Sequence, residues 1–111
     1  MRRPGSVFGR VERIGNLTFD FATRTVTVFG RPLPLPRHEL AVLEQLVLAI
    51  GRVVTKETLI DKVYGFEEPE SNAIPVHIHH LRRRLEDAGS TVCIHTFRGL
   101  GYMLAPMETM T

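Results

Sequence analysis

The feature that most constrains the fold is a two-sided segment at residues 72–88, with the sequence NAIPVHIHHLRRRLEDA. At about 100° per residue, the period of an α-helix, one set of aliphatic side chains falls within a narrow arc and a second, mostly polar set lies opposite. The aliphatic arc contains Ile74, Ile78, Leu81 and Leu85, and the opposite face contains Asn72, Val76, His79, His80 and Arg83. The segment therefore predicts an amphipathic α-helix with one face in the core.

A hairpin pattern follows this helix. Residues 91–95, TVCIH, favour a β-strand, and residues 95–102, HTFRGLGY, contain two glycines that permit a tight turn. These glycines place Arg98 at the tip of the predicted hairpin. An α-helix fits the major groove of DNA, and a helix beside an arginine-tipped hairpin is typical of DNA-binding proteins.

Length and composition indicate one globular domain. The chain has 111 residues, of which 43% are hydrophobic and 23% charged. No apolar run approaches the roughly 18 residues that a membrane span requires, and no signal-peptide core follows the basic start of the chain. Cys93 is the sole cysteine, and we expect it to be a small hydrophobe in a strand. A reducing cytoplasm, with no membrane partner, is therefore the expected location.

Charge is unevenly distributed, although the net charge is only +2. Residues 57–70 contain five acids and one base, whereas residues 71–84 contain three arginines, three histidines and no acid. Positive charge thus concentrates on the predicted helix, where it would meet a polyanion such as DNA. From charge alone, an ordinary solvated helix face explains the arginines equally well.

The N-terminal part of the chain predicts a small antiparallel sheet of three or four strands. Alternation is loose at 7–14 and clear at 17–20 and 25–29, with turns at 22–24 and 30–31. The run PLPL at 32–35 follows the second turn, and its prolines should lie at strand ends or on an edge.

A helical period begins at about residue 37. Residues 37–50 carry an apolar stripe, and Gly51 is a plausible C-terminal stop. The stripe contains Leu40, Leu43, Leu46, Val47 and Ile50.

A second helix should follow a short extended link at 53–55. Thr55 can cap its N-terminus, and it should end near 64–65, where an acidic loop begins. Ser71 or Asn72 then caps the helix at 72–88, with Pro75 tolerated in its first turn.

Linked motifs accompany this order of sheet, three helices and hairpin. They are GNLTFD at 15–20, Glu39 with Leu43, VVTKETL at 53–59, NAIPVHI at 72–78, LRRRL at 81–85 and TFRGLGY at 96–102. In this order and spacing they resemble the C-terminal effector domain of OmpR/PhoB-type two-component response regulators. The resemblance implies an α+β winged helix-turn-helix domain at 14–105. Residues 1–13 would then be a linker remnant with the start of the first strand, and 106–111 a C-terminal tail.

The chain departs from the family pattern at several positions. Pro36 replaces the threonine that usually caps the first helix, and Pro36 could be the first helical residue, leaving that end less well capped. Pro75 replaces an acid of the recognition helix, so a contact that relatives make there is lost. His79 and His80 stand where many relatives carry arginine, which changes the base preference but not the binding mode.

The resemblance also implies which residues contact DNA. They are Val76, His77, His79, His80, Arg82 and Arg83 on the helix, which would lie in the major groove, and Thr96 and Arg98 in the wing. Val76 would touch a thymine methyl group, and His80 would contact a base edge. Arg82 and Arg83 would bind phosphates, which position the domain without encoding sequence. Arg98 would enter the minor groove, where narrow A·T-rich stretches concentrate negative potential.

Protein partners follow from the resemblance as well. The acidic loop, with Phe66, Glu67, Glu68 and Glu70, corresponds to the segment through which family members touch RNA polymerase, although a solvated connector has the same composition. Relatives bind directly repeated half-sites as head-to-tail dimers. The basic start of the chain resembles the end of a linker from a receiver domain, so we expect an excised effector domain.

Three alternatives to DNA binding are weaker. The histidines at 77, 79 and 80 suggest a metal site, but residues 77 and 79 point about 160° apart on a helix, so these three ligands cannot converge on one ion. A metal site here would have to borrow Glu or Asp from elsewhere in the chain. His77 could equally be a partly buried structural histidine. Neither a nucleophile–base pair nor a phosphate-binding loop is present, so no enzyme and no cofactor are expected. A winged-helix protein-interaction module is the strongest rival, and the lack of an acid on the exposed helix face before Glu86 favours DNA.

Overall fold

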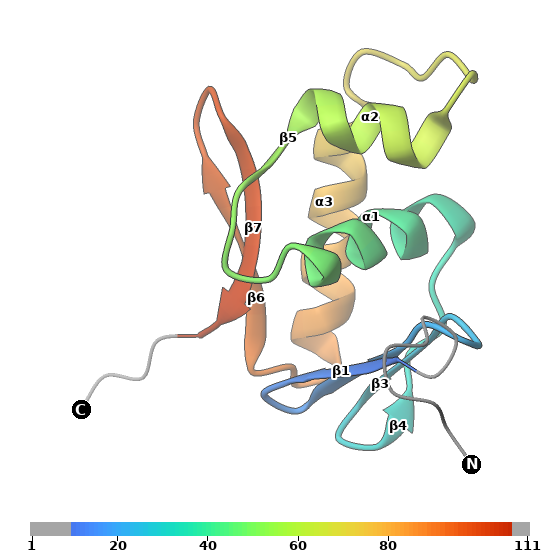
Figure 1. Cartoon of the computed structure of the whole chain (residues 1–111). Coiled ribbons are helices and arrows are strands. Elements are labelled where there is room, and N and C mark those ends of the chain that lie inside the picture. The colour runs from blue at the N-terminus through green and yellow to red at the C-terminus, as the bar shows by residue number, and fades with distance from the viewer. Residues whose placement is uncertain (1–9, 108–111) are drawn as a thin grey trace.

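The computed structural model describes residues 10–107, so residues 1–9 and 108–111, where most of the predicted linker remnant and tail fall, lie outside the described part. The strands are β1 Val11–Ile14, β2 Leu17–Asp20, β3 Thr25–Val28, β4 Arg31–Pro32, β5 Val54–Thr55, β6 Val92–Phe97 and β7 Gly101–Pro106; the helices are α1 Arg37–Leu48, α2 Lys56–Tyr64 and α3 Ala73–Asp87. Figure 1 shows a four-stranded sheet at one end, the helices above it and the β6–β7 hairpin alongside. The predicted α+β winged helix-turn-helix fold is confirmed.

The N-terminal sheet is antiparallel, in the order β1-β2-β3-β4. Its inward side chains alternate as expected for a half-buried sheet, with Leu17 and Phe19 of β2 fully buried. The predicted third strand is one residue too long, because Phe29 and Gly30 adopt positive φ angles of 56° and 74° and form the turn into β4. Phe29 therefore leaves the ladder and is exposed.

Helix α1 ends two residues earlier than predicted, at Leu48, and Gly51 follows with a φ of 79°. Its fully buried stripe includes Val42, whereas Leu40 and Ile50 are only partly buried. Pro36 occupies the N-cap position rather than the first helical turn; its carbonyl accepts the hydrogen bond from Leu40 N at 2.8 Å, and no side chain caps this end.

The caps of the other two helices differ. Thr55 caps α2 as predicted, since its hydroxyl accepts a hydrogen bond from Thr58 N at 3.1 Å. Asn72 occupies the N-cap position of α3 without a side-chain capping bond, contrary to the prediction, and Pro75 lies in the first turn.

Residues 53–55, predicted as a linking segment, contribute a strand to the wing. Val54 pairs with Tyr102 and Thr55 with Gly101, which gives a three-stranded sheet in the order β5-β7-β6. A Cβ on Gly101 would overlap the carbonyl oxygen of Val54, so only glycine allows this approach. The wing is thereby joined directly to the start of α2.

The two sheets are connected through Asn16, in the turn between β1 and β2. Its side-chain nitrogen donates to Gly89 O at 2.9 Å, and its side-chain oxygen accepts from Thr91 N at 2.9 Å. These bonds attach the N-terminal sheet to the turn between α3 and β6. Across residues 10–107, no helix has the length and apolar character needed to cross a membrane.

Candidate nucleic-acid interface

Helix α3 has the two faces that its sequence predicts. Ile74, Ile78, Leu81 and Leu85 are each at most 2% exposed, and they pack into the core shared with α1 and the wing. The opposite face is solvent-exposed and carries Val76, His79, His80 and Arg83. Packing of the aliphatic arc therefore determines which side chains α3 presents outward.

His79 and Arg83 lie one helical turn apart on the exposed face of α3. Among residues 10–107, neither side chain forms an ion pair or a hydrogen bond with a neighbour. Val76, another turn toward the N-terminus, is 38% exposed. These three residues form a strip whose polar members are open to a ligand.

Arg82 joins α3 to the wing. Its guanidinium donates to the carbonyl oxygen of Ile94 at 2.8 and 3.0 Å and to the hydroxyl of Thr96 at 2.5 Å. Both Arg82 and Thr96 are predicted to approach DNA, and the structure brings them into contact with each other. An arginine has five donor hydrogens, so donors remain on Arg82 for a phosphate.

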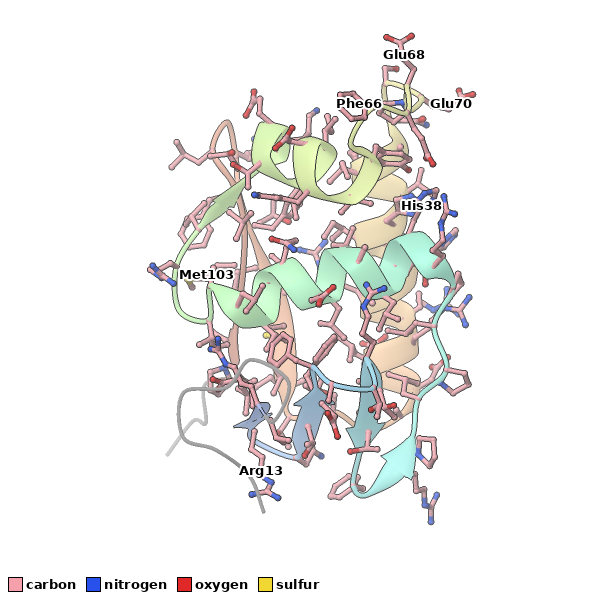
Figure 2. The ribbon with its side chains drawn as sticks, turned by 45° about the vertical axis from the view of Figure 1, so that its right-hand side comes forward. Arg13, His38, Phe66, Glu68, Glu70 and Met103 are labelled. Carbon is pink, nitrogen blue, oxygen red and sulfur yellow. The ribbon has the colours of Figure 1, made fainter. Side chains whose placement is uncertain are left out.

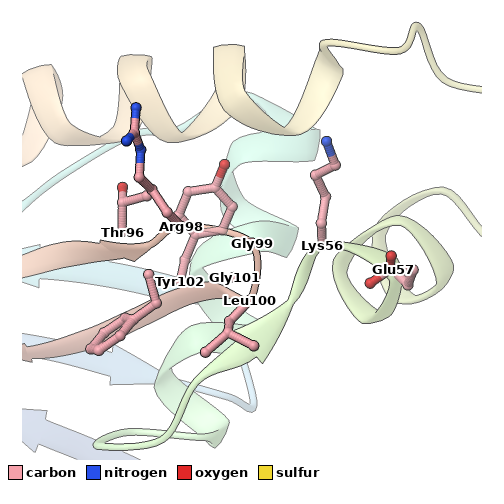
Figure 3. Close-up of a pocket in the computed structure, with 9 residues that line it drawn as sticks. Lys56, Glu57, Thr96, Arg98, Gly99, Leu100, Gly101 and Tyr102 are labelled. Atoms are coloured by element: carbon pink, nitrogen blue, oxygen red, sulfur yellow. The ribbon is translucent and has the colours of Figure 1, made fainter.

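The wing tip is the turn Arg98–Leu100 between β6 and β7. Leu100 N donates to Phe97 O at 2.8 Å, which closes the turn, and the Arg98 side chain is exposed. A hollow of about 420 Å³ lies between this tip and the start of α2. In Figure 3, Arg98 and Lys56 lie on two sides of that hollow and extend toward the side on which α3 runs.

Lys56 is a candidate residue that the sequence analysis missed. It is the first residue of α2 and is exposed. A usable signal was present, because Lys56 directly follows the Thr55 cap and the first helix of a helix-turn-helix crosses the DNA backbone.

His77 is enclosed by side chains from the other two helices. Its Nε2 lies 2.6 Å from the hydroxyl of Tyr64, and the His38 ring centroid is 5.5 Å away. Burial lowers the pKa of His77, and the nearby His38 lowers it further. Burial, with a smaller effect of Glu67, raises the pKa of the Tyr64 hydroxyl. Both rings are therefore neutral near pH 7, and the contact of His77 with DNA stays a prediction.

His80 is held from the core side by Glu39 of α1. Its Nδ1 lies 3.3 Å from one carboxylate oxygen of Glu39, and the other oxygen accepts a hydrogen bond from Arg84 Nε at 2.8 Å. Glu39 is only 4% exposed, whereas the His80 side chain is 50% exposed. The sequence placed Glu39 in the first helix, but a contact between residues so far apart in the chain left no local signal.

The acidic loop between α2 and α3 carries a fully exposed aromatic residue, Phe66. Glu67 is paired with Arg37 at 3.1 Å, whereas Glu68 and Glu70 are exposed. Figure 2 shows Phe66, Glu68 and Glu70 together at the outer end of the loop.

The three histidines of α3 do not converge on a common point with other metal-binding side chains of the described residues. Within the described range, 10–107, no group of three or more His, Cys, Asp or Glu side chains could hold a metal ion. The free thiol of Cys93 is half-buried, with His95 Nε2 at 3.5 Å.

Comparison with known proteins agrees with this geometry. Residues 30–104 match the family described as "Transcriptional regulatory protein, C terminal". The chain is 40% identical over 105 residues to the probable transcriptional regulatory protein y4xI of Sinorhizobium fredii, covering 94% of this chain and 46% of that protein. It is 44% identical over 90 residues to the response regulator MprA of a Mycobacterium species, and the match covers 80% of this chain and 39% of that protein. The chain therefore spans less than half the length of these relatives.

Solved structures with the same fold include several DNA-binding domains. The Klebsiella pneumoniae RstA DNA-binding domain, in complex with the RstA box, superposes with a TM-score of 0.75 at 26% identity, covering 87% of this chain and 98% of that one. The DNA-binding domain of CpxR from E. coli gives 0.74 at 28% identity, with coverages of 89% and 99%. The Thermotoga maritima OmpR/PhoB homologue DrrB gives 0.72 at 33% identity, with coverages of 86% and 44%.

Proposed function

Because the chain belongs to the family of C-terminal DNA-binding domains of OmpR/PhoB-type response regulators, we propose that it binds specific double-stranded DNA in the bacterial cytoplasm through α3 and the wing. The family is one of transcriptional regulators rather than a class of enzymes. The observation that carries the proposal is the pair of exposed basic side chains on two adjacent elements, Arg83 on α3 and Arg98 at the wing tip, neither of which has an ion-pair partner among residues 10–107.

The role proposed for each residue in DNA binding follows from its exposure and its element. With α3 in the major groove, Val76 contacts a thymine methyl group, and His79 and His80 face base edges. Arg82 and Arg83 neutralise phosphates. Arg98 enters the neighbouring minor groove.

Lys56 adds a phosphate contact to the interface. It lies across the hollow from Arg98 and, like Arg98, makes no ion pair within the described residues. A backbone segment running between the wing tip and the start of α2 would meet both cations. We include Lys56 among the residues that position the domain without specifying bases.

Partners beyond DNA belong to the same proposal. We infer that residues 14–105 act as the effector unit of a response regulator, controlled by a receiver domain. One domain of this size makes few base contacts, so two copies arranged head to tail on directly repeated half-sites would increase affinity and specificity.

The loop surface formed by Phe66, Glu67, Glu68 and Glu70 is the proposed contact with RNA polymerase. Phe66 is fully exposed and lies with Glu68 and Glu70 at the outer end of the loop, where one partner surface can reach all three side chains, which supports this role. Phe66→Ser should reduce transcription in a purified system while leaving DNA affinity unchanged. Equal loss of DNA affinity and transcription would contradict a separate polymerase contact.

The first test of DNA binding is selection from a randomised pool, with the enriched sites then measured at several salt concentrations. We expect two direct half-sites about one helical turn apart and a steep salt dependence. Weak binding that ignores sequence would contradict the proposal and favour the protein-interaction module.

A further inference from the structure

Glu39 is the one charged side chain buried in the core of residues 10–107. It lies in the first turn of α1 and is 4% exposed. A buried carboxylate is costly unless partners compensate its charge. The side chains that contact Glu39 therefore indicate its structural role.

Both partners come from α3. One carboxylate oxygen accepts the 2.8 Å hydrogen bond from Arg84 Nε, and the other lies 3.3 Å from His80 Nδ1. His80 and Arg84 are separated by four residues, so they are neighbours along one side of the helix. A single carboxylate on α1 thus holds two consecutive turns of α3, and each of its oxygens has its own partner.

The contact with Glu39 determines where the proton of a neutral His80 lies. An unprotonated Nδ1 would direct a lone pair at a negative oxygen 3.3 Å away, which is unfavourable, so the contact favours the neutral tautomer with its hydrogen on Nδ1. The other nitrogen, Nε2, then has a free lone pair and points away from the carboxylate. Because half of the His80 side chain is exposed, this acceptor is available to a ligand on the outer face of α3.

We propose that Glu39 is a positioning residue for base recognition, which fixes His80 as the Nδ1–H tautomer and directs its Nε2 acceptor toward the major groove. The inference rests on the proposed function, with α3 in that groove. A hydrogen-bond acceptor is complementary to the amino groups of adenine N6 and cytosine N4, and not to the acceptor atoms of guanine and thymine. His80 should therefore favour adenine or cytosine at one position of the half-site.

His79 provides an internal comparison. It is exposed on the same helix, its ring centroid lies 5.8 Å from that of His80, and no carboxylate among residues 10–107 contacts it. Its tautomer is therefore not fixed by the protein. His79 can donate or accept, so it should discriminate less between bases than His80 does.

The first experiment measures the tautomers directly, without DNA. Nitrogen-15 NMR of the imidazole rings at pH 8 should show His80 protonated at Nδ1 in the wild type and in Arg84→Met. Glu39→Met removes the acceptor with an unbranched side chain of similar length and should convert His80 to a mixture of tautomers. A predominantly Nε2–H ring in the wild type would overturn the proposal, and that measurement needs no variant to fold.

The second experiment compares base preferences by selection from the randomised DNA pool. His80→Ala identifies the base pair that His80 contacts, where the wild type should select adenine or cytosine. Glu39→Met should reduce discrimination at this base pair by roughly fivefold, about the effect of one hydrogen bond, and leave the other positions unchanged. In the His80→Ala background, Glu39→Met should have no additional effect.

Arg84→Met serves as the control, because it also breaks the Glu39–Arg84 pair but leaves the Glu39–His80 contact in place. It should retain the preference at that base pair. If Glu39→Met retains it as well, the positioning role is wrong while the proposed function stands. If the wild type enriches no sequence, the proposed function itself fails, and the recognition role of His80 fails with it.

Discussion

Helix α3 and the wing tip, the two elements proposed to contact DNA, are held in place very differently. On α3, four aliphatic side chains lie in the core, and His77, His80 and Arg82 each contact a neighbouring element. At the wing tip, the exposed Arg98 makes no such contact within the described residues.

This difference indicates separate roles in binding. Side chains that are already ordered lose little conformational entropy when they meet a base, so α3 is suited to discriminate sequences. An exposed arginine without contacts must be ordered on binding, but it can follow the shape and potential of a groove. We therefore expect α3 to determine which bases are preferred and the wing to add affinity that depends on groove width.

The largest effect should come from detaching the wing. In Gly101→Ala the new Cβ would overlap the Val54 carbonyl oxygen and lie 2.8 Å from Thr55 Cα, so β5 and β7 must separate. We expect the free energy of unfolding to fall by about 1–3 kcal/mol, as for other forced backbone shifts, with loss of specific DNA binding. Chemical denaturation and a DNA-binding titration measure the two effects.

Gly99→Asn is the control for this change. Gly99 also has a positive φ, but no atom lies within 4 Å of a Cβ placed there, and asparagine tolerates this conformation. It should be close to wild-type stability. Equal destabilisation by both substitutions would show that the turn, rather than the β5–β7 contact, holds the wing.

Much of this architecture could be predicted from the sequence where a local period carries the information. The buried arc of α3 and the alternation in β2 depend on spacing alone, and both match the structure. The two-residue strand β5 could not be found in this way, because it is too short to show a period and exists only through pairing with β7.

In the candidate site too, features that depend on a local period could be predicted from the sequence, and contacts between distant residues could not. Exposure of His79 and Arg83 follows from the helical period. The contacts of His80 with Glu39, and of Arg82 with Ile94, join residues that are distant in sequence or lie in different elements. They also involve side-chain atoms that no pattern of residue types specifies. The sequence therefore predicts which residues face outward, and tertiary packing determines which of these side chains are fixed by contacts with other elements.

A smaller effect should follow the removal of one exposed cation from α3. Arg83→Ala should weaken binding to all DNA sequences by roughly tenfold, about the contribution of one charge-assisted hydrogen bond. The slope of log affinity against log salt should fall by about one. Arg13→Ala removes an exposed arginine from the N-terminal sheet, at the other end of the molecule from the acidic loop in Figure 2, and should change neither quantity. A changed base preference would instead show that Arg83 contacts bases.

Removal of the wing cation should weaken binding no more than removal of Arg83, because Arg98 is likewise exposed and its side chain must be ordered on binding. Arg98→Ala should weaken binding by roughly fivefold and flatten the preference for A·T pairs beside the major-groove site. Selection of sites with the variant measures both. Leu100→Ala alters the same exposed tip without changing its charge and should keep the A·T preference; an unchanged preference in Arg98→Ala would contradict the minor-groove role.

The exposed His79 should make DNA binding respond to pH by a few-fold. A protonated imidazole is favoured beside the DNA polyanion, so affinity at constant salt should be higher at pH 5.5 than at pH 8. His79→Gln should reduce this response. A flat profile between pH 5.5 and 8 would contradict a contribution of His79 charge to binding.

The smallest expected effect is on the pH dependence of stability, and it distinguishes the partly buried His77 from the exposed His79 and His80. Burial lowers the pKa of His77 in the folded protein, so below the ordinary histidine value of about 6.5 the unfolded chain binds more protons than the folded one. The contribution of His77 to stability is therefore present above that pH and is lost as the pH falls, opposite in direction to the effect on DNA binding. His77→Gln can retain a hydrogen bond to Tyr64 but does not titrate, so its melting temperature should fall less than that of the wild type between pH 7.5 and 5.5. An equal decrease in melting temperature in both proteins would mean that the burial of His77 does not affect its protonation. The difference between side chains that contact other elements and exposed side chains without contacts would then not apply to the histidines.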